Sequence, residues 1–497
     1  MMSQHFPVLQ VLVPLLAGPL CVLLRSATGA WLVFAAASWI ATALAAALLF
    51  GVLASGPISY ALGGWPAPFG IVYAIDAANA LVLLLVSLIA AAVSVYAREP
   101  VAREIPAERA YLFYACLCLC LAGLLGIVAT GDAFNVFVFL EISSLSGYTL
   151  IALGRRRQAL LAAMQYLIMG TVGGTFLLIG IGLAYALTGT LNMADMAVRL
   201  AELPVGPAMN AAVAFVVLGL AIKAAVFPLH AWLPGAYAEA PSAVNTFLSA
   251  TGTKVALYAL ARFAFTVFGA GVVIGTLNGT TVGLVLGTLA MLFGAALACR
   301  QDDLRRLLAF SSVGQLGYIV VGLSLATAGG VSAAMLHLVA HGLIKAALFG
   351  LAGYLALRLG GVRLSDLSGL GRRSPWAFFA LLIGGLGLVG VPVTAGFVSK
   401  WALVLALIDA GQIWVLAALL VSSLLALVYV WRVVEVAWFG EPAGEALPTE
   451  KPGGMVLAVA PDAADGLAAL LTGQGETVVR LGHVTPGAGL TATGRLM

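Results

Sequence analysis

The sequence predicts an all-α polytopic membrane protein with about thirteen transmembrane helices. Of its 497 residues, 62% are apolar and only 9% are charged, whereas soluble domains have about 25% charged residues. Apolar runs of about 20 residues, the length that crosses a bilayer, recur from Pro7 to Phe439. The formal charge of +4 is spread over many loops and gives no reason to expect a nucleic-acid partner.

Charges, glycines and prolines divide the apolar runs into separate helices. The first run is not preceded by a basic segment and lacks a clear cleavage site, so we expect a retained helix rather than a signal peptide. The five cysteines lie inside apolar runs, where packing is expected rather than metal or redox chemistry. The expected helices cover residues 7–24, 30–53, 71–97, 110–129, 134–153, 160–187, 208–230, 240–262, 271–298, 306–326, 331–357, 376–402 and 412–439.

Basic residues predict the orientation of these helices, because loops rich in lysine and arginine stay in the cytoplasm. Loops after even-numbered helices hold only Arg199, with Arg262 at a helix end. We therefore expect a bacterial inner-membrane protein whose N-terminus lies outside and whose C-terminal tail is cytoplasmic. Loops after odd-numbered helices hold Arg25, Arg98, Arg103, Arg109, Arg155, Arg156, Arg157, Arg300, Arg305, Arg306, Arg358, Arg363, Arg372 and Arg373.

Several ionisable side chains fall inside the expected helices. A charge at the bilayer centre costs about 2.5 to 3.5 kcal/mol even on the gentlest scale, so each one requires a polar interior and is usually functional. Such a row of titratable groups predicts a proton pathway. The residues are Asp76, Glu141, Lys223, Lys254, His337, His341, Lys345 and Lys400.

Glu141 and Lys223 lie near the middle of two different expected helices. A carboxylate and an amine that meet in a low-dielectric interior stabilise each other's charge, and separating them reverses the effect. The pair can therefore work as a proton switch. A static ion pair that only fixes helix packing is the alternative.

Two proline-containing interruptions adjoin intramembrane lysines. Pro228 follows Lys223 by five residues, and Pro392 with its neighbouring glycines precedes Lys400. Broken helices at corresponding places in two halves of a transporter indicate an ion site, although either kink alone could serve packing only. The two breaks suggest a repeat of five helices, residues 110–268 and 269–440, whose second copy is inverted in the membrane.

His337, His341 and Lys345 are spaced four residues apart and share one helix face. Histidine titrates near neutral pH, and desolvation moves lysine toward that range, so the three residues can form a proton relay. Packing histidines and a zinc site are the alternatives, but no third metal ligand accompanies the pair. His230 and Glu239 lie at expected cytoplasmic helix ends, where a surface role competes with proton entry.

Five motifs resemble one family over residues 1–440, the proton-translocating antiporter-like subunits of respiratory complex I, membrane-bound hydrogenases and Mrp cation/proton antiporters. The segment YALGGWPAPFGIVYAID, together with lysine at position 400, is most similar to the MrpD-type subunits of the Mrp antiporters. The five motifs are GDAFNVFVFLEI, KAAVFPLHAWLPGAYAEAPSAVNTFLSATGTKVALYAL, RRLLAFSSVGQLGYI, HLVAHGLIKAALF and GVPVTAGFVSKW.

This resemblance implies roles for the ionisable residues inside the expected helices. Glu141 and Lys223 match the first half-channel, Lys254 the bridging lysine, and Lys400 the terminal lysine, with His337 and His341 at the centre. Members of the family act beside sister membrane subunits, so the resemblance implies such partners here. In the Mrp case it implies that the assembly exchanges Na⁺ or another monovalent cation for protons. The alternative is a proton-pumping arm of an NADH:quinone oxidoreductase-like or hydrogenase assembly. The sequence contains no cofactor motif, so we expect partners to handle any electrons.

The remaining segments flank the two repeats. Residues 1–109 form an expected N-terminal three-helix segment. Residues 441–497 replace the family's last helix with a strand–helix–strand pattern that resembles the C-terminal end of aminoimidazole ribonucleotide synthetase. So short a segment can hardly bury a core alone, and no enzymatic activity is expected from it.

Overall fold

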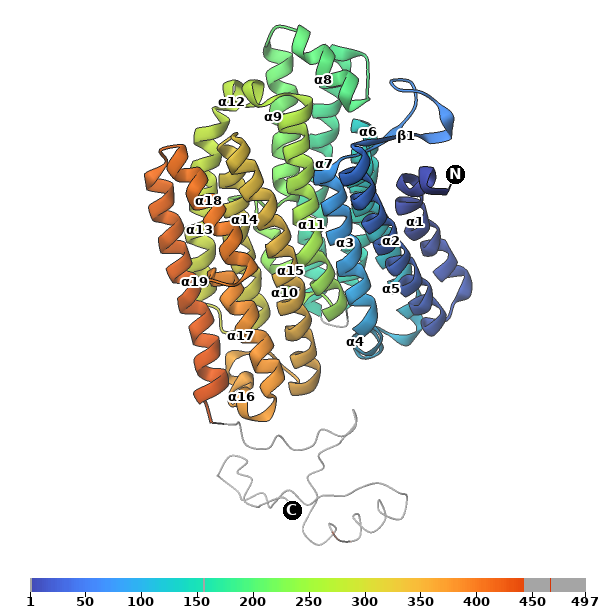
Figure 1. The fold of residues 1–497 in the computed structure, drawn as a ribbon. Coiled ribbons are helices and arrows are strands. Elements are labelled where there is room, and N and C mark those ends of the chain that lie inside the picture. The colour runs from blue at the N-terminus through green and yellow to red at the C-terminus, as the bar shows by residue number, and fades with distance from the viewer. Residues whose placement is uncertain (1, 155–156, 442–464, 466–497) are drawn as a thin grey trace. The chain divides into compact units, whose positions relative to one another are not determined.

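The computed structural model describes residues 2–154, 157–441 and Asp465. The chain divides into two compact units, Met1–Pro442 and Ala443–Met497. The first unit is a bundle of long, roughly parallel and antiparallel helices (Figure 1). The strand–helix–strand pattern expected in the tail lies outside the described residues.

The N-terminal segment consists of helices and one small β-hairpin. The hairpin pairs β1 with β2 in antiparallel register, Ile58 opposite Ile75, and marks one end of the bundle. We call this the hairpin end; α4 and α16 mark the opposite end (Figure 1). The elements are α1 (Phe6–Leu24), α2 (Ala27–Ser55), β1 (Ile58–Ala61), β2 (Val72–Ile75), α3 (Ala77–Tyr96) and α4 (Arg98–Glu104).

The next helices occupy the expected first repeat. Asp132 caps α6 by accepting from the backbone N–H of Asn135, which explains why the helix begins directly after the loop. The elements are α5 (Ala110–Ala129), α6 (Ala133–Ala152), α7 (Arg157–Thr188), α8 (Met193–Glu202), α9 (Pro207–Lys223), α10 (Trp232–Glu239) and α11 (Ser242–Ala261). A π-helical turn, Arg262–Val267, extends α11.

The second half of the bundle runs in the opposite sense. The first long helix of the first half, α5, ends at the hairpin end, whereas α13 begins there (Figure 1). That relation is the one that inverted repeats require. The elements are α12 (Ala270–Leu277), α13 (Gly279–Cys299), α14 (Leu304–Ser324), α15 (Ala328–Leu359), α16 (Leu370–Arg373), α17 (Pro375–Val389), α18 (Ala395–Asp409) and α19 (Ile413–Phe439).

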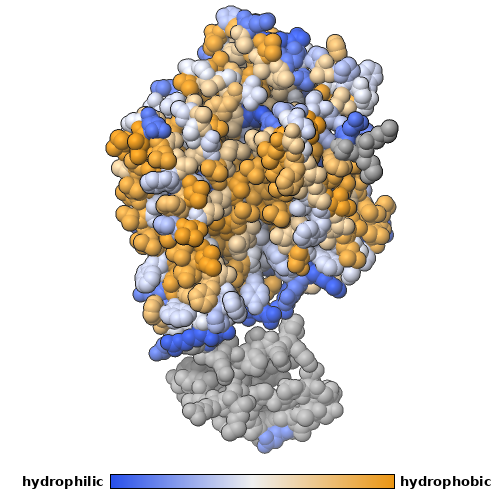
Figure 2. All heavy atoms as spheres, in the orientation of Figure 1, coloured by the Kyte–Doolittle hydropathy of each residue, from blue (hydrophilic) through white to orange (hydrophobic). Residues whose placement is uncertain are grey.

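The helices have the length and composition of membrane spans. Among the described residues, 10 helices are long and apolar enough to cross a bilayer, or 11 if the bent pair formed by residues 242–267 and α12 is one span. Two shorter apolar helices, α9 and α17, are the ones expected to be broken. Figure 2 shows apolar side chains covering a broad zone between two polar ends. The all-α membrane fold is confirmed, and the count of thirteen stays a prediction.

Glycines allow the helices to approach one another closely, as is typical of membrane bundles. At Gly123 of α5, an added Cβ would lie 2.6 Å from the backbone nitrogen of Ser143 on α6. At Gly219 of α9, it would lie 2.6 Å from the backbone nitrogen of Leu177 on α7. The first contact brings α5 against α6, and the second brings α9 against α7.

Two details of the expected helices are wrong. The sequence predicts Asp76 within a helix, but it is the N-cap of α3, where its carboxylate accepts from Ala78 and Asn79. The run 271–298 is predicted as one helix, but the chain turns at Asn278, whose φ of 47° is left-handed, and separates α12 from α13. Asparagine tolerates that conformation better than most residues, which explains the turn.

Candidate functional site

The first helix break places Lys223 at the end of α9. The chain leaves the α-helix after Lys223 and re-enters it at Trp232, with Pro228 in the intervening segment. Proline cannot donate a backbone hydrogen bond, and Ala225 has a left-handed φ of 54°. The main-chain oxygen of Ile222 accepts from the Trp232 indole over 3.0 Å and from the backbone N–H of Ala225 over 3.1 Å. The break is thus bridged by a side chain.

Lys223 meets Glu141, as the sequence predicted. The amine Nζ lies 3.4 Å from Oε1 of Glu141 on α6 and donates to Ser144 Oγ over 2.7 Å and to Tyr148 Oη over 3.3 Å. The lysine side chain is 5% exposed and that of the glutamate 26%, so the carboxylate is the more accessible partner. Sequence reasoning missed both hydroxyls, although the polar run SSLSGY in an apolar helix was a signal for them.

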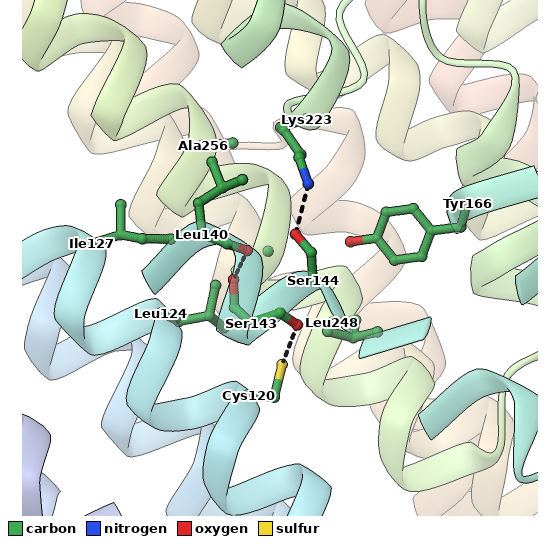
Figure 3. A pocket seen from close by; sticks show the side chains of 11 residues that line it. Cys120, Leu124, Ile127, Leu140, Ser143, Ser144, Tyr166, Lys223, Leu248 and Ala256 are labelled. Atoms are coloured by element: carbon green, nitrogen blue, oxygen red, sulfur yellow. Dashed lines mark hydrogen bonds between the residues drawn. The ribbon is translucent and has the colours of Figure 1, made fainter. Parts of the chain in front are cut away.

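A cavity adjoins this pair. It has a volume of about 30 Å³ and is lined by residues of α5, α6, α7, α9 and α11. This is space for one or two water molecules. Figure 3 shows the Lys223 amine bonded to Ser144, with the Tyr166 hydroxyl directed toward the same region. Gly252 and Ala256 of α11 line the wall, on either side of Lys254 in the sequence.

Lys254 is fully buried on α11. Its amine donates to the main-chain oxygen of Ser249 and lies 3.5 Å from Thr253 Oγ1. A helix buried in an apolar bundle seldom carries so many polar groups. The following polar side chains lie between the start of α11 and Lys254, and all of them are buried: Ser242, Asn245, Thr246, Ser249, Thr251 and Thr253.

His337 on α15 is held between two other helices. Its Nε2 lies 3.0 Å from Gln315 Oε1 on α14, and its Nδ1 lies 2.9 Å from Ser399 Oγ on α18. Because the Gln315 amide nitrogen donates to the Leu388 oxygen, its Oε1 faces the imidazole and accepts from Nε2–H. Gln315 therefore selects the histidine tautomer.

Lys400 occupies the second helix break. α17 ends at Val389 and α18 begins at Ala395, with Pro392 between them. The Lys400 amine donates to the freed main-chain oxygens of Leu388 over 2.9 Å and Val389 over 3.0 Å. It also lies 4.6 Å from the centre of the Tyr318 ring. Both breaks predicted at Pro228 and Pro392 are thus present, each beside a buried amine.

The remaining members of the expected relay do not bond to one another. Lys345 donates to Leu308 O over 2.6 Å and Ser311 Oγ over 2.5 Å, both on α14. The ring of His341 stacks on that of His337 with centroids 6.1 Å apart. Neither ring nitrogen of His341 has a hydrogen-bond partner in the described part of the chain. Buried polar atoms of this kind are normally satisfied by water, so continuity along α15 requires water molecules.

The structure buries Lys223, Lys254, His337, His341, Lys345 and Lys400 inside the helical bundle, with Glu141 partly exposed beside Lys223. Across the described ranges, no group of three or more histidine, cysteine or acidic side chains is arranged to hold a metal. The site is built of amines, imidazoles and hydroxyls, which can exchange protons. This arrangement defines a class: membrane proteins with a polar axis of titratable groups crossing a helical bundle.

Comparison with known proteins agrees with that class. The transmembrane family described as "NADH:quinone oxidoreductase/Mrp antiporter" matches residues 130–426. The N subunit of NADH-quinone oxidoreductase from Desulforudis audaxviator is 44% identical over 444 residues, covering 88% of this chain and 87% of that protein. The D subunit of the Na⁺/H⁺ antiporter from Bacillus subtilis is 32% identical over 442 residues, covering 88% of each.

Two solved structures share the fold. A chain of the membrane-bound sulfane sulfur reductase, an archaeal respiratory membrane complex, matches with a TM-score of 0.82 and 32% identity, covering 94% of this chain and 93% of that one. A chain of the Mrp complex from Dietzia sp. matches with a TM-score of 0.81 and 32% identity, covering 89% and 81%. The chain belongs to the NADH:quinone oxidoreductase/Mrp antiporter transmembrane family, and the predicted resemblance is confirmed.

Proposed function

We propose that this chain conducts protons along the row from Glu141 to Lys400, as one subunit of a multisubunit membrane complex. The observation that carries the proposal is the contact of Lys223 with Glu141 at a broken helix, beside a cavity with space for water. When the amine and the carboxylate touch, each stabilises the charge of the other. When they part, the buried amine loses that support and can release its proton.

The second half of the row supports a relay in the same way. Lys254 and Lys345 are fully buried amines whose hydrogen-bond acceptors are neutral oxygens. An uncompensated buried charge is costly, so each amine readily passes a proton to a neighbour through water or hydroxyl groups. Hydrogen bonds connect His337 with Lys400: Gln315 bonds to His337, and both Gln315 and Lys400 donate to the Leu388 oxygen.

The first candidate assembly is a monovalent cation/proton antiporter. One similar protein is named as the D subunit of a Na⁺/H⁺ antiporter, and another belongs to an Mrp complex. In this assignment the chain exchanges protons for Na⁺ or another monovalent cation together with sister subunits. The partly exposed Glu141 carboxylate favours a neighbouring subunit on that side, because a charge facing lipid would be costly.

The second candidate is the proton-pumping arm of a redox complex. The specific observation in its favour is the 44% identity to a protein named as the N subunit of NADH-quinone oxidoreductase, supported by the likeness to a respiratory membrane complex. In this assignment electron transfer in the partner proteins drives the same row of groups. Both candidates place the chain in a bacterial inner membrane with the hairpin end outside, as the arginine distribution predicts.

One reconstitution experiment separates the two candidates. The chain is purified with its native partners, and proton flux into vesicles is followed with a pH-sensitive dye. Flux driven by a Na⁺ gradient alone supports the antiporter, and flux that requires NADH and a quinone supports the redox arm. Flux that persists in Glu141→Ala, Lys223→Ala and Lys400→Ala complexes would contradict proton conduction along this row.

A further inference from the structure

The two lysines at the helix breaks differ in the group that balances their charge. Lys223 has the Glu141 carboxylate at 3.4 Å. Lys400 forms no ion pair with an acidic side chain in the described part of the chain, although it is only 5% exposed. The main-chain oxygens that accept from its amine are neutral. An ammonium buried in this way requires a further compensating group.

The ring of Tyr318 lies against this ammonium. Lys400 Nζ is 4.6 Å from the ring centre, and Tyr318 is 1% exposed. The face of an aromatic ring carries partial negative charge, which attracts a cation within about 6 Å and does so most strongly where water is excluded. Ser423 on α19 bonds to both groups: its Oγ lies 3.3 Å from the Tyr318 hydroxyl and accepts from Lys400 over 3.3 Å. The ring and the amine are thus held together at two points.

Tyr318 is the last of three residues on one face of α14 that contact the row. Their spacing of four and then three residues places them on that face over about 10 Å. The ring of Tyr318 also borders that of His337, with centroids 5.3 Å apart, so it contacts both the central histidine and the terminal lysine. The three contacts pair Ser311 with Lys345, Gln315 with His337 and Tyr318 with Lys400.

Tyr148 provides a comparison at the first break. The Lys223 amine lies 3.3 Å from the Tyr148 hydroxyl but 5.9 Å from the centre of its ring, so the hydroxyl is the closer partner. At the second break the ring centre is nearer to the amine, at 4.6 Å. An aromatic ring is thus peripheral to Lys223, which has a carboxylate, and close to Lys400, which pairs with none among the described residues.

We infer that the Tyr318 ring takes the place of a carboxylate at Lys400: it stabilises the ammonium and so keeps a proton on that amine. The inference rests on the proposed proton conduction, to which it adds a positioning residue. A carboxylate can take up the proton of the lysine that it stabilises, as Glu141 can from Lys223, whereas the face of a ring has no lone pair that binds a proton. A proton that reaches Lys400 therefore stays on the amine until a water molecule or another base removes it.

The test changes the charge on the ring face while its shape is kept. Tyr318→Phe and its mono-, di- and trifluorinated analogues are compared, and proton flux is measured in vesicles of the complete complex. Each fluorine withdraws electron density from the ring face and weakens its attraction for a cation. Because a buried charge is unfavourable, a less stabilised ammonium is populated less often. We expect the flux to fall stepwise along the series, by about tenfold in total.

The same series at position 148 is the matched control. The flux should be equal in Tyr148→Phe and in its fluorinated forms, because Glu141 supplies the opposite charge there and the ring lies farther from the amine. Each series is compared with its own phenylalanine variant, so the loss of the hydroxyl cancels. Equal flux along the series at position 318 overturns the inference, since it would mean that Tyr318 contributes only its shape.

A stability measurement gives a second decision that does not depend on transport. Tyr318→Leu should lower the thermal unfolding midpoint of the complex, and the loss should be smaller when Lys400→Met is also present, because a neutral side chain gains less from the ring. An equal loss in both backgrounds overturns the inference. Lys223→Ala is assayed for flux in parallel. Its loss of flux beside a flat series at position 318 refutes only the role of Tyr318, whereas retained flux in Lys223→Ala refutes proton conduction itself.

Discussion

Lys400 donates a hydrogen bond of 2.9 Å to the main-chain oxygen of Leu388, twelve residues earlier in the chain. The amine thereby satisfies an oxygen that the end of α17 leaves without a helical partner. Gln315 donates to the same oxygen over 3.3 Å. The buried charge and the broken helix are therefore parts of one arrangement, which links α14, α17 and α18.

Replacing Lys400 should weaken this arrangement as well as transport. Lys400→Met removes the donor to the Val389 oxygen and leaves the Leu388 oxygen with Gln315 alone. An unsatisfied buried group costs about 1 to 3 kcal/mol. We expect a lower free energy of unfolding in detergent and a loss of proton flux. Lys400→Arg, which keeps donors and charge, should lose less stability. A Lys400→Met variant as stable as the wild type would show that the hydrogen bonds of Lys400 do not stabilise this helix break.

Gly174 on α7 controls the position of the Glu141 carboxylate. A Cβ at this position would collide with Glu141 Oε1, the oxygen that faces Lys223. Gly174→Ala should therefore displace the carboxylate and reduce proton flux by about tenfold, since proton transfer depends on contact geometry. Gly182→Ala on the same helix is the control, because no atom lies within 4 Å of its added Cβ. Equal flux in both variants would remove the glutamate contact from the mechanism.

The Glu141–Lys223 pair should show energetic coupling. Either single change, Glu141→Gln or Lys223→Met, leaves the other charge without its partner, and the double change removes both. For groups in contact, a double-mutant cycle typically gives a coupling of about 0.5 to 3 kcal/mol. We expect a value in that range from unfolding measurements on the purified complex. Additive effects would mean that the 3.4 Å contact contributes nothing to the free energy of unfolding.

Gln315 should affect proton flux through its hydrogen bond to His337. Gln315→Leu removes the acceptor of His337 Nε2 and the donor to Leu388, so the imidazole loses its fixed tautomer. We expect proton flux to fall by about tenfold with normal assembly. Ser312→Ala, on the same helix, removes only a hydroxyl that bonds within α14 and should have little effect. A similar loss in both variants would indicate a general packing defect.

The row of buried groups was largely predictable because charges in apolar segments are conspicuous. Lys223, Lys254, His337, Lys345 and Lys400 are all buried as the sequence predicted. Their roles in proton transfer stay predictions. The hydroxyl and amide groups that bind them were missed, because serine, tyrosine and glutamine are common in membrane helices and carry no charge to single them out.

The position of Asp76 was predicted wrongly. Its place in an apolar run suggested a mid-membrane charge, but the helix begins only after it, and Arg262, 186 residues away, neutralises it. Helix boundaries are the least predictable feature of an apolar run, because the capping residue and the first turn have no distinctive periodicity. The partner could not be predicted, since no local rule relates two residues so far apart.

Composition and spacing alone determined that this chain is a helical membrane protein, with amines beside two broken helices, because unfavourable charges and prolines are visible in any apolar sequence. Only the tertiary structure decided which groups touch: Lys223 with Glu141, His337 with Gln315 and Ser399, Lys400 with the end of α17. The reason is that these contacts join different helices. Their geometry is set by how glycine-lined helix faces pack, and that packing depends on the whole bundle at once.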